Sequence, residues 1–134
     1  MPRFTYDMPL RWADMDANGH MNNAVYSNYL EDTRFRMFSN LVPADPAERL
    51  ACNFLVREQT LKYIRPLVYR EEPVTIEAWV EDVKGASFII RCKIKDGEDV
   101  YVESRTLIAG FDSTANTVRR FREDEREAIA SFTE

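Results

Sequence analysis

The apolar residues of this chain change their spacing once, and that change limits the folds that it can adopt. Over residues 23–40 they recur every three or four positions, the period of an α-helix with one buried face. From residue 54 to residue 111 they recur mainly at every second position, the period of a strand with one face against a core. The sequence therefore predicts one long helix followed by strands.

The predicted helix has a broad apolar face. Residues at helical spacing form it: Tyr26, Tyr29, Leu30, Thr33, Met37 and Leu41. Val25, Phe35 and Phe38 widen this face, so we expect the helix to be well buried. Asn22 suits the N-cap position, and the prolines from Pro43 onward end the helix.

The remaining segments predict an antiparallel sheet. Strands are expected at residues 3–12, 54–64, 74–81, 88–94 and 100–111, and a charged helix with solvated charges at residues 120–130. Lys84-Gly85 and Asp96-Gly97 are turn signals between strands. One buried helix can be covered by a curved sheet. The open edges of such a sheet are often closed by a second copy, so a dimer is expected.

Composition fits a single soluble domain spanning residues 1–134. Hydrophobic residues make up 45% of the chain, and the net charge of −5 gives no general attraction to nucleic acid or to anionic membranes. Cys52 and Cys92 lie far apart and the chain has one histidine, which excludes a thiolate-rich zinc site. With reduced cysteines, no signal peptide and no transmembrane segment, we expect a cytoplasmic protein without membrane insertion.

A polar loop ahead of the predicted helix allows three interpretations. The first is a calcium loop, because Asp14, Asp16, Asn18 and Gly19 match the opening half of an EF-hand. Val25 occupies the position of the bidentate glutamate, however, and the preceding segment is a predicted strand. The sequence therefore disfavours calcium.

The second interpretation is structural, since aspartate and asparagine are ordinary residues of loops and caps, and Gly19 can supply a positive φ. The third is catalytic. The first N–H groups of a helix lack intrahelical partners and lie at the positive end of its dipole, so they can stabilise an oxyanion. A carboxylate a few residues earlier could attack a carbonyl carbon or activate water.

One motif spans this loop and the first half of the predicted helix: Asp16-x-x-Gly19-His20-x-Asn22-Asn23-x-x-Tyr26-x-x-Tyr29-x-Glu31. It resembles the signature of the 4-hydroxybenzoyl-CoA thioesterase-like branch of the hotdog superfamily. Asp16, Asn18 and His20 also match the Asp-x-Asn-x-His spacing of plant-type acyl-ACP thioesterases. The resemblance covers nearly the whole chain. It implies the hotdog fold, an α+β architecture with a curved antiparallel β-sheet wrapped around one long central helix, and it implies thioester hydrolysis.

The resemblance also implies a role for each matching residue. Asp16 occupies the position of the catalytic carboxylate, and the backbone N–H of Asn23 lies where the family polarises the thioester carbonyl. Asn18 and His20 would orient water or the carboxylate. Sites of this family lie at a dimer interface, so a homodimer or homotetramer is expected. The substrate would be an acyl-CoA or an acyl carrier protein thioester, and neither a metal nor a cofactor is implied.

Other residues are weaker candidates. Tyr26 at the acyl pocket and Arg65 at the coenzyme A phosphates are expected to bind substrate, whereas Asp14 is expected to be structural and Glu58 a solvated strand residue. The His-x-Asn-Asn part of the motif favours aliphatic over aromatic acyl groups. The alternatives are a non-catalytic acyl-thioester-binding hotdog protein and a hotdog hydratase.

Overall fold

The computed structural model describes residues 3–134, and its elements follow the predicted order. They are β1 (Phe4–Met8), a 3-10 turn (Trp12–Asp14), α1 (Tyr26–Met37), a second 3-10 turn (Ser39–Leu41), α2 (Pro46–Ala51), β2 (Asn53–Tyr63), β3 (Val74–Glu81), β4 (Ser87–Asp96), β5 (Asp99–Asp112), β6 (Thr117–Val118) and α3 (Glu123–Ala130). Two predicted elements are too long, because β1 ends at Met8 and α1 begins only at Tyr26.

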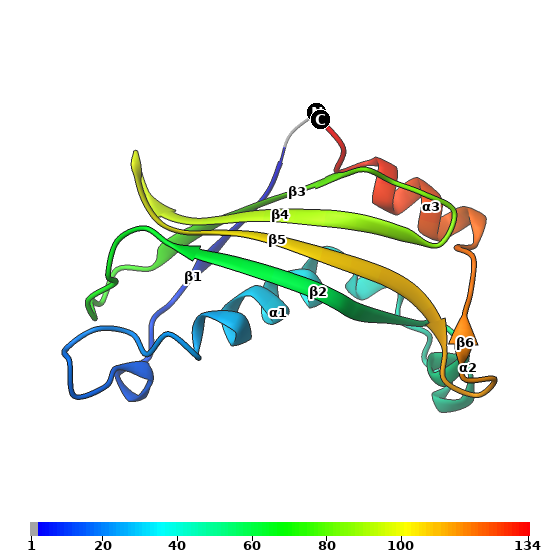
Figure 1. The fold of residues 1–134 in the computed structure, drawn as a ribbon, viewed down its shortest axis with the longest axis horizontal. Helices are drawn as coiled ribbons and strands as arrows, with labels where there is room; N and C mark the ends of the chain where they lie inside the picture. Colours follow the sequence, from blue (N-terminus) through cyan, green and yellow to red (C-terminus); the bar gives the residue numbers. More distant parts are fainter. Residues whose placement is uncertain (1–2) are drawn as a thin grey trace.

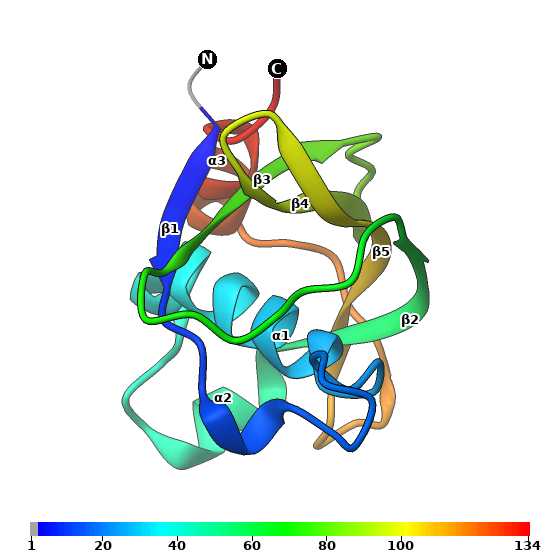
Figure 2. The same cartoon turned by 90° about the vertical axis from the view of Figure 1, so that its left-hand side faces the viewer.

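The strands form one antiparallel sheet that arches over α1. Its order is β1-β3-β4-β5-β2, and β6 pairs with β5 beyond this path. Figure 1 shows the sheet as a long arch above α1, and Figure 2, viewed from one end, shows it curling around the helix. The expected wrapping of one helix by a curved antiparallel sheet is confirmed.

The core lies between α1 and the concave face of the sheet. The buried residues of α1 are Tyr26, Tyr29, Leu30, Thr33 and Met37, as the helical spacing predicted. In β3 the burial alternates residue by residue, again as predicted. Phe35 was expected on the buried face, but it is 60% exposed and lines a surface groove between α1 and the start of β2.

Strand β2 is a long open edge. It pairs with β5 on one side, with a bulge between Val56 and Glu58, and no strand among residues 3–134 pairs with its other side. Leu55 and Val56 are 42% and 47% exposed. An edge of eleven residues with exposed apolar side chains is suited to pairing with another strand.

The C-terminal helix is held by a buried ion pair. The Arg119 guanidinium donates to both Glu125 carboxylate oxygens, at 2.7 and 2.8 Å, and Glu125 is 1% exposed. The interpretation of this charged segment as a solvated surface was therefore wrong at these two residues. Arg119 also donates to the carbonyls of Phe111 and Asn53, which anchors the segment before α3 to the sheet.

Short elements were missed. Helix α2 is capped by Asp45, whose carboxylate accepts from Glu48 N, with Pro46 at the start of the helix. This is a standard helix-start signal, although a six-residue helix has too few positions to show a period. No helix within residues 3–134 has the length and apolar character needed to cross a membrane.

Candidate active site

The loop between β1 and α1 folds back on itself around Gly19. Met15 and Met21 form a bridge, and the Asp16 N–H donates to the His20 carbonyl at 3.0 Å. Gly19 has a φ of +82°, a conformation that side chains disfavour. This confirms the predicted positive φ and brings the residues on either side of the turn close to Asp16.

Two donors fix the Asp16 carboxylate. Oδ1 accepts from the backbone N–H of Asn18 at 2.9 Å, and Oδ2 accepts from the Asn22 side-chain Nδ2 at 3.1 Å. Each oxygen keeps a lone pair that could accept a further proton donor. The two hydrogen bonds hold the Asp16 side chain in one orientation. Because this side chain is only partly buried, part of it stays open to solvent.

The turn before α1 offers an unused donor. The Val25 N–H donates to the Asn22 carbonyl and the Ala24 N–H to Asn22 Oδ1, whereas the Asn23 N–H donates no hydrogen bond to any part of the chain from residue 3 onward. Asn22 was predicted as the N-cap, which was wrong. Val25 occupies that position, and the Asn22 side chain instead links the turn to Asp16.

Asn18 and His20 contact Asp16 only through their main chains. The Asn18 side chain is exposed and the His20 ring partly buried, and neither side chain forms a hydrogen bond among residues 3–134. The amide side chain that reaches the carboxylate is that of Asn22. Sequence reasoning missed this contact, although a reversal at Gly19 places Asn22 opposite Asp16.

Asp14, which was expected to be structural, is engaged by a side chain of α1. Its Oδ2 accepts from the Tyr29 hydroxyl at 2.6 Å, and Tyr29 in turn accepts from the Arg11 N–H at 3.3 Å. Burial, and then this hydrogen bond to Asp14, raise the pKa of Tyr29 to about 12. The contact fastens the loop to the first turn of α1.

One hollow adjoins this region, and a second lies near the other end of β2. The first, of about 400 Å³, opens beside Asp16 and is lined by Trp12, Ala13, Met15, Asp16, Gly19, Val68 and Tyr69. The Trp12 side chain is 74% exposed at its rim and meets the Tyr69 ring edge-on, with centroids 5.8 Å apart. An exposed aromatic pair beside a fixed carboxylate is a surface suited to a partly apolar ligand.

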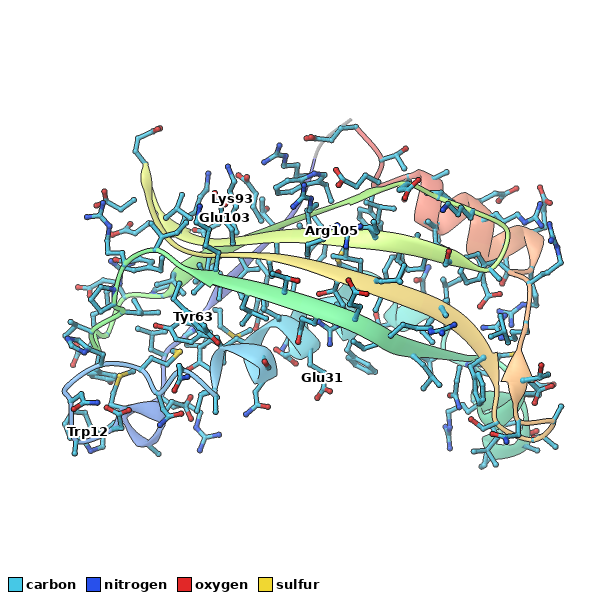
Figure 3. The ribbon with its side chains drawn as sticks, in the orientation of Figure 1. Trp12, Glu31, Tyr63, Lys93, Glu103 and Arg105 are labelled. Atoms are coloured by element: carbon cyan, nitrogen blue, oxygen red, sulfur yellow. The ribbon has the colours of Figure 1, made fainter. Side chains whose placement is uncertain are left out.

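The second hollow, called the α1–β2 groove below, has about 290 Å³ and lies between the C-terminal half of α1 and the first residues of β2. Most of its lining side chains are apolar, and a few are polar. The complete lining consists of Glu31, Arg34, Phe35, Phe38, Leu41, Val42, Pro43, Arg49, Cys52, Asn53, Phe54, Val56, Phe88, Ile90 and Ile108. Figure 3 shows Glu31 projecting from α1 below β2.

Within residues 3–134, neither of the two residues expected to bind substrate is hydrogen-bonded to Asp16. Tyr26 is 3% exposed and packs on Tyr63, so within one chain it is a core residue. Arg65 is exposed and lies 3.7 Å from Asp99. A Glu58 carboxylate oxygen lies 3.9 Å from a guanidinium nitrogen of Arg105, and Figure 3 shows Arg105 on the outer face of the sheet. The exposed position of Glu58 is consistent with the expected solvated strand residue.

Comparison with known proteins is consistent with this architecture. The family model of the thioesterase-like superfamily matches residues 10–129. The PA2801 protein of Pseudomonas aeruginosa, a proposed thioesterase, is 26% identical with a TM-score of 0.81, covering 93% of this chain and 96% of that one. No curated protein shows significant sequence similarity to the chain.

Two similar structures contain coenzyme A. One is a Staphylococcus aureus protein in complex with CoA, at 19% identity and a TM-score of 0.86, covering 97% of this chain and 83% of that one. The other is a Thermus thermophilus thioesterase complexed with coenzyme A and Zn, at 22% identity and a TM-score of 0.78, covering 93% and 95%. The fold is the hotdog fold, and the chain belongs to the thioesterase-like superfamily.

Proposed function

We propose that the protein is an acyl-CoA thioesterase in which Asp16 acts on the thioester carbonyl. The observation that carries this proposal is the pairing of a fixed carboxylate with an unused donor. Asp16 is held by Asn18 N and Asn22 Nδ2, and the free Asn23 N–H lies across the same turn, ahead of the positive end of α1.

The reaction is hydrolysis of the C–S bond. Asp16 either removes a proton from the attacking water or attacks the carbonyl carbon itself. The carbonyl oxygen becomes negative in the tetrahedral intermediate, where the Asn23 N–H and the helix dipole stabilise it. Collapse of the intermediate breaks the C–S bond, and the thiolate leaves and takes up a proton. If Asp16 is the nucleophile, this collapse leaves a mixed anhydride on its carboxylate, which a water molecule then hydrolyses. In both routes water supplies the second oxygen of the free acid.

The site is proposed to be completed by a second copy. Tyr63, at the end of β2, donates to the Asn23 carbonyl at 3.0 Å, so the catalytic loop adjoins the C-terminal end of this strand. The α1–β2 groove adjoins its N-terminal end, through Asn53, Phe54 and Val56. Antiparallel pairing of two β2 edges puts opposite ends side by side. The groove of one copy would then face the Asp16 loop of the other.

The thiol portion is proposed to be coenzyme A. Two solved relatives of this fold contain CoA, and the hollow with Trp12 and Tyr69 lies directly beside Asp16, where the pantetheine arm would pass. Arg65 remains the proposed phosphate contact, since it is exposed and its ion pair with Asp99, at 3.7 Å, is long. An acyl carrier protein is the alternative source of the thioester.

Thiol release from short, long and aromatic acyl-CoAs tests this function. We expect release well above the uncatalysed rate for at least one acyl group. Hydration of an enoyl-CoA without release of thiol would instead identify a hydratase. Binding without either reaction would identify the non-catalytic alternative, unless an acyl carrier protein thioester is hydrolysed.

A further inference from the structure

Arg34 is a cation without a partner in the α1–β2 groove. Among the arginines of residues 3–134, it is the only one that is partly buried and forms neither an ion pair nor a side-chain hydrogen bond. The other partly buried arginines all contact a carboxylate, and the remaining unpaired ones are exposed. Burial lowers the pKa of Arg34, while the nearby Cys92 and Glu31 raise it.

A buried polar group lies on the concave face of the sheet, opposite Cys92. Ser104 is 5% exposed, and within residues 3–134 its Oγ is the buried side-chain atom without a hydrogen-bond partner. Ser104 pairs across the sheet with Cys92, the thiol that lies near Arg34. Next along β5, the buried Thr106 accepts from the Gln59 side chain at 3.2 Å. A polar band therefore crosses the otherwise apolar concave face.

This arrangement lacks an anion. A guanidinium withdrawn from water loses hydration, and only an acceptor of opposite charge compensates for that loss well. Among the described residues that line the groove, Glu31 is the one with an acidic side chain. It is exposed and forms no ion pair with Arg34. Arg49 also lines the groove, so its charged groups are two cations and one exposed carboxylate. The groove is therefore complementary to a negative ligand.

The size of the groove suits a small occupant. Its volume of about 290 Å³ is at the lower end of ligand pockets. A short acyl group is of a size that this volume can hold. Apolar side chains such as Phe38 and Phe54 would contact its methylene groups.

Resting on the proposed function, we propose that the substrates are thioesters of short dicarboxylic acids, whose free carboxylate pairs with Arg34 in the α1–β2 groove. The thioester end then points toward the mouth of the groove, where the Asp16 loop of the partner copy would lie. Arg34 is a specificity-determining residue in this proposal, since it binds the end of the acyl group that does not react.

A matched pair of substrates tests the proposal. Glutaryl-CoA carries a free carboxylate, and its monomethyl ester differs mainly in charge. We expect kcat/KM of the wild-type protein to favour glutaryl-CoA by roughly 10- to 100-fold, the range of a charge-assisted contact. Equal kcat/KM values would overturn the proposal, while leaving the thioesterase function intact.

Variants of Arg34 assign the preference to this residue. Arg34→Met should reduce the glutaryl-to-ester ratio to about one, and Arg34→Lys should restore part of it, because the charge returns without the planar fork. Arg36→Met is the matched control, as Arg36 lies on the same helix but pairs with Asp32 at the surface. It should leave the ratio unchanged. A ratio that survives Arg34→Met would overturn the proposal.

Calorimetric binding separates this proposal from the catalytic one. Glutaryl-CoA and its monomethyl ester are titrated into Asp16→Asn protein, with and without Arg34→Met. Tighter binding of glutaryl-CoA that is lost with Arg34→Met supports the inference even if thiol release fails. Equal binding of both thioesters, with Arg34→Met dissociating the oligomer, would show that an acid of the partner copy pairs with Arg34, and would contradict it.

Discussion

Two aspartates of the polar loop differ in their surroundings. Asp16 faces an open hollow, while Asp14, two residues earlier, is tied to Tyr29. The difference arises because the turn around Gly19 leaves Asp16 on the open side, with two donors that orient it. Of these two donors, the Asn18 N–H belongs to the main chain, and only the Asn22 amide can be removed by a substitution.

We expect Asn22→Ala to lower kcat/KM for thiol release by about tenfold, since one hydrogen bond to a charged group is lost. The free energy of unfolding should fall by about 1 kcal/mol. Asn28→Ala, an exposed change on α1, is the control and should alter neither quantity. Wild-type kcat/KM in the Asn22 variant would show that the main-chain contact from Asn18 is sufficient.

The Tyr29–Asp14 contact predicts a change of stability at high pH. The pKa of Tyr29 is about 12 in the folded protein and near 10 in an unfolded chain, so its contribution is complete below pH 10 and is lost as the pH rises to 12. Urea denaturation of Tyr29→Phe and wild type should show a difference of about 1–2 kcal/mol at pH 8 that shrinks across this window. A difference independent of pH would contradict this assignment.

Among the elements, α1 and the strands were predictable because long periodic segments report their burial directly. The helical spacing identified the buried face of α1, and the alternation in β3 identified its inner side. Phe35 was misplaced because apolar character does not distinguish a core position from the lining of a groove. The start of α1 was misplaced because Asn22 satisfies donors of a turn, at Ala24 and Val25, that precedes the helix.

The attachment of α3 could not be predicted, because it depends on a long-range ion pair. Arg119 and Glu125 lie in a stretch of mixed charges, and nothing local marks these two as buried. Glu125→Ala should lower the free energy of unfolding by about 3 kcal/mol, since it leaves a partly buried guanidinium without its anion. Glu127→Ala on the same helix is exposed and should change it by less than about 0.5 kcal/mol. Chemical denaturation of both variants checks the prediction, and equal effects would refute it.

At the scale of the whole molecule, the open β2 edge is the feature with the largest consequence. The sequence predicted a dimer from the general problem of edge strands, and β2 is a long edge strand with exposed apolar side chains and no strand partner on its outer side within residues 3–134. The residues that meet across this edge depend on the register between two β2 strands. The structure of a single chain does not determine that register. The proposed composite site depends on this pairing.

We expect light scattering to give at least twice the mass of the chain, and Val56→Glu to weaken the assembly by about 100-fold or more, because a carboxylate would replace an exposed apolar side chain of the proposed interface. Val83→Glu is a matched control, since Val83 is 42% exposed and lies in the connection between β3 and β4. Thiol release should fall with dissociation. An active Val56→Glu monomer would contradict a site shared between copies.

The most direct test of the account is thiol release by Asp16→Asn beside Asp7→Asn, an exposed aspartate on β1. The asparagine keeps the shape of the side chain but can neither accept the proton of water nor attack the carbonyl carbon. We predict a loss of at least about 100-fold in kcat for Asp16→Asn, with unchanged thermal unfolding and oligomeric state, and wild-type kinetics for Asp7→Asn. Thiol release at the wild-type rate by Asp16→Asn would contradict the assignment of the catalytic carboxylate.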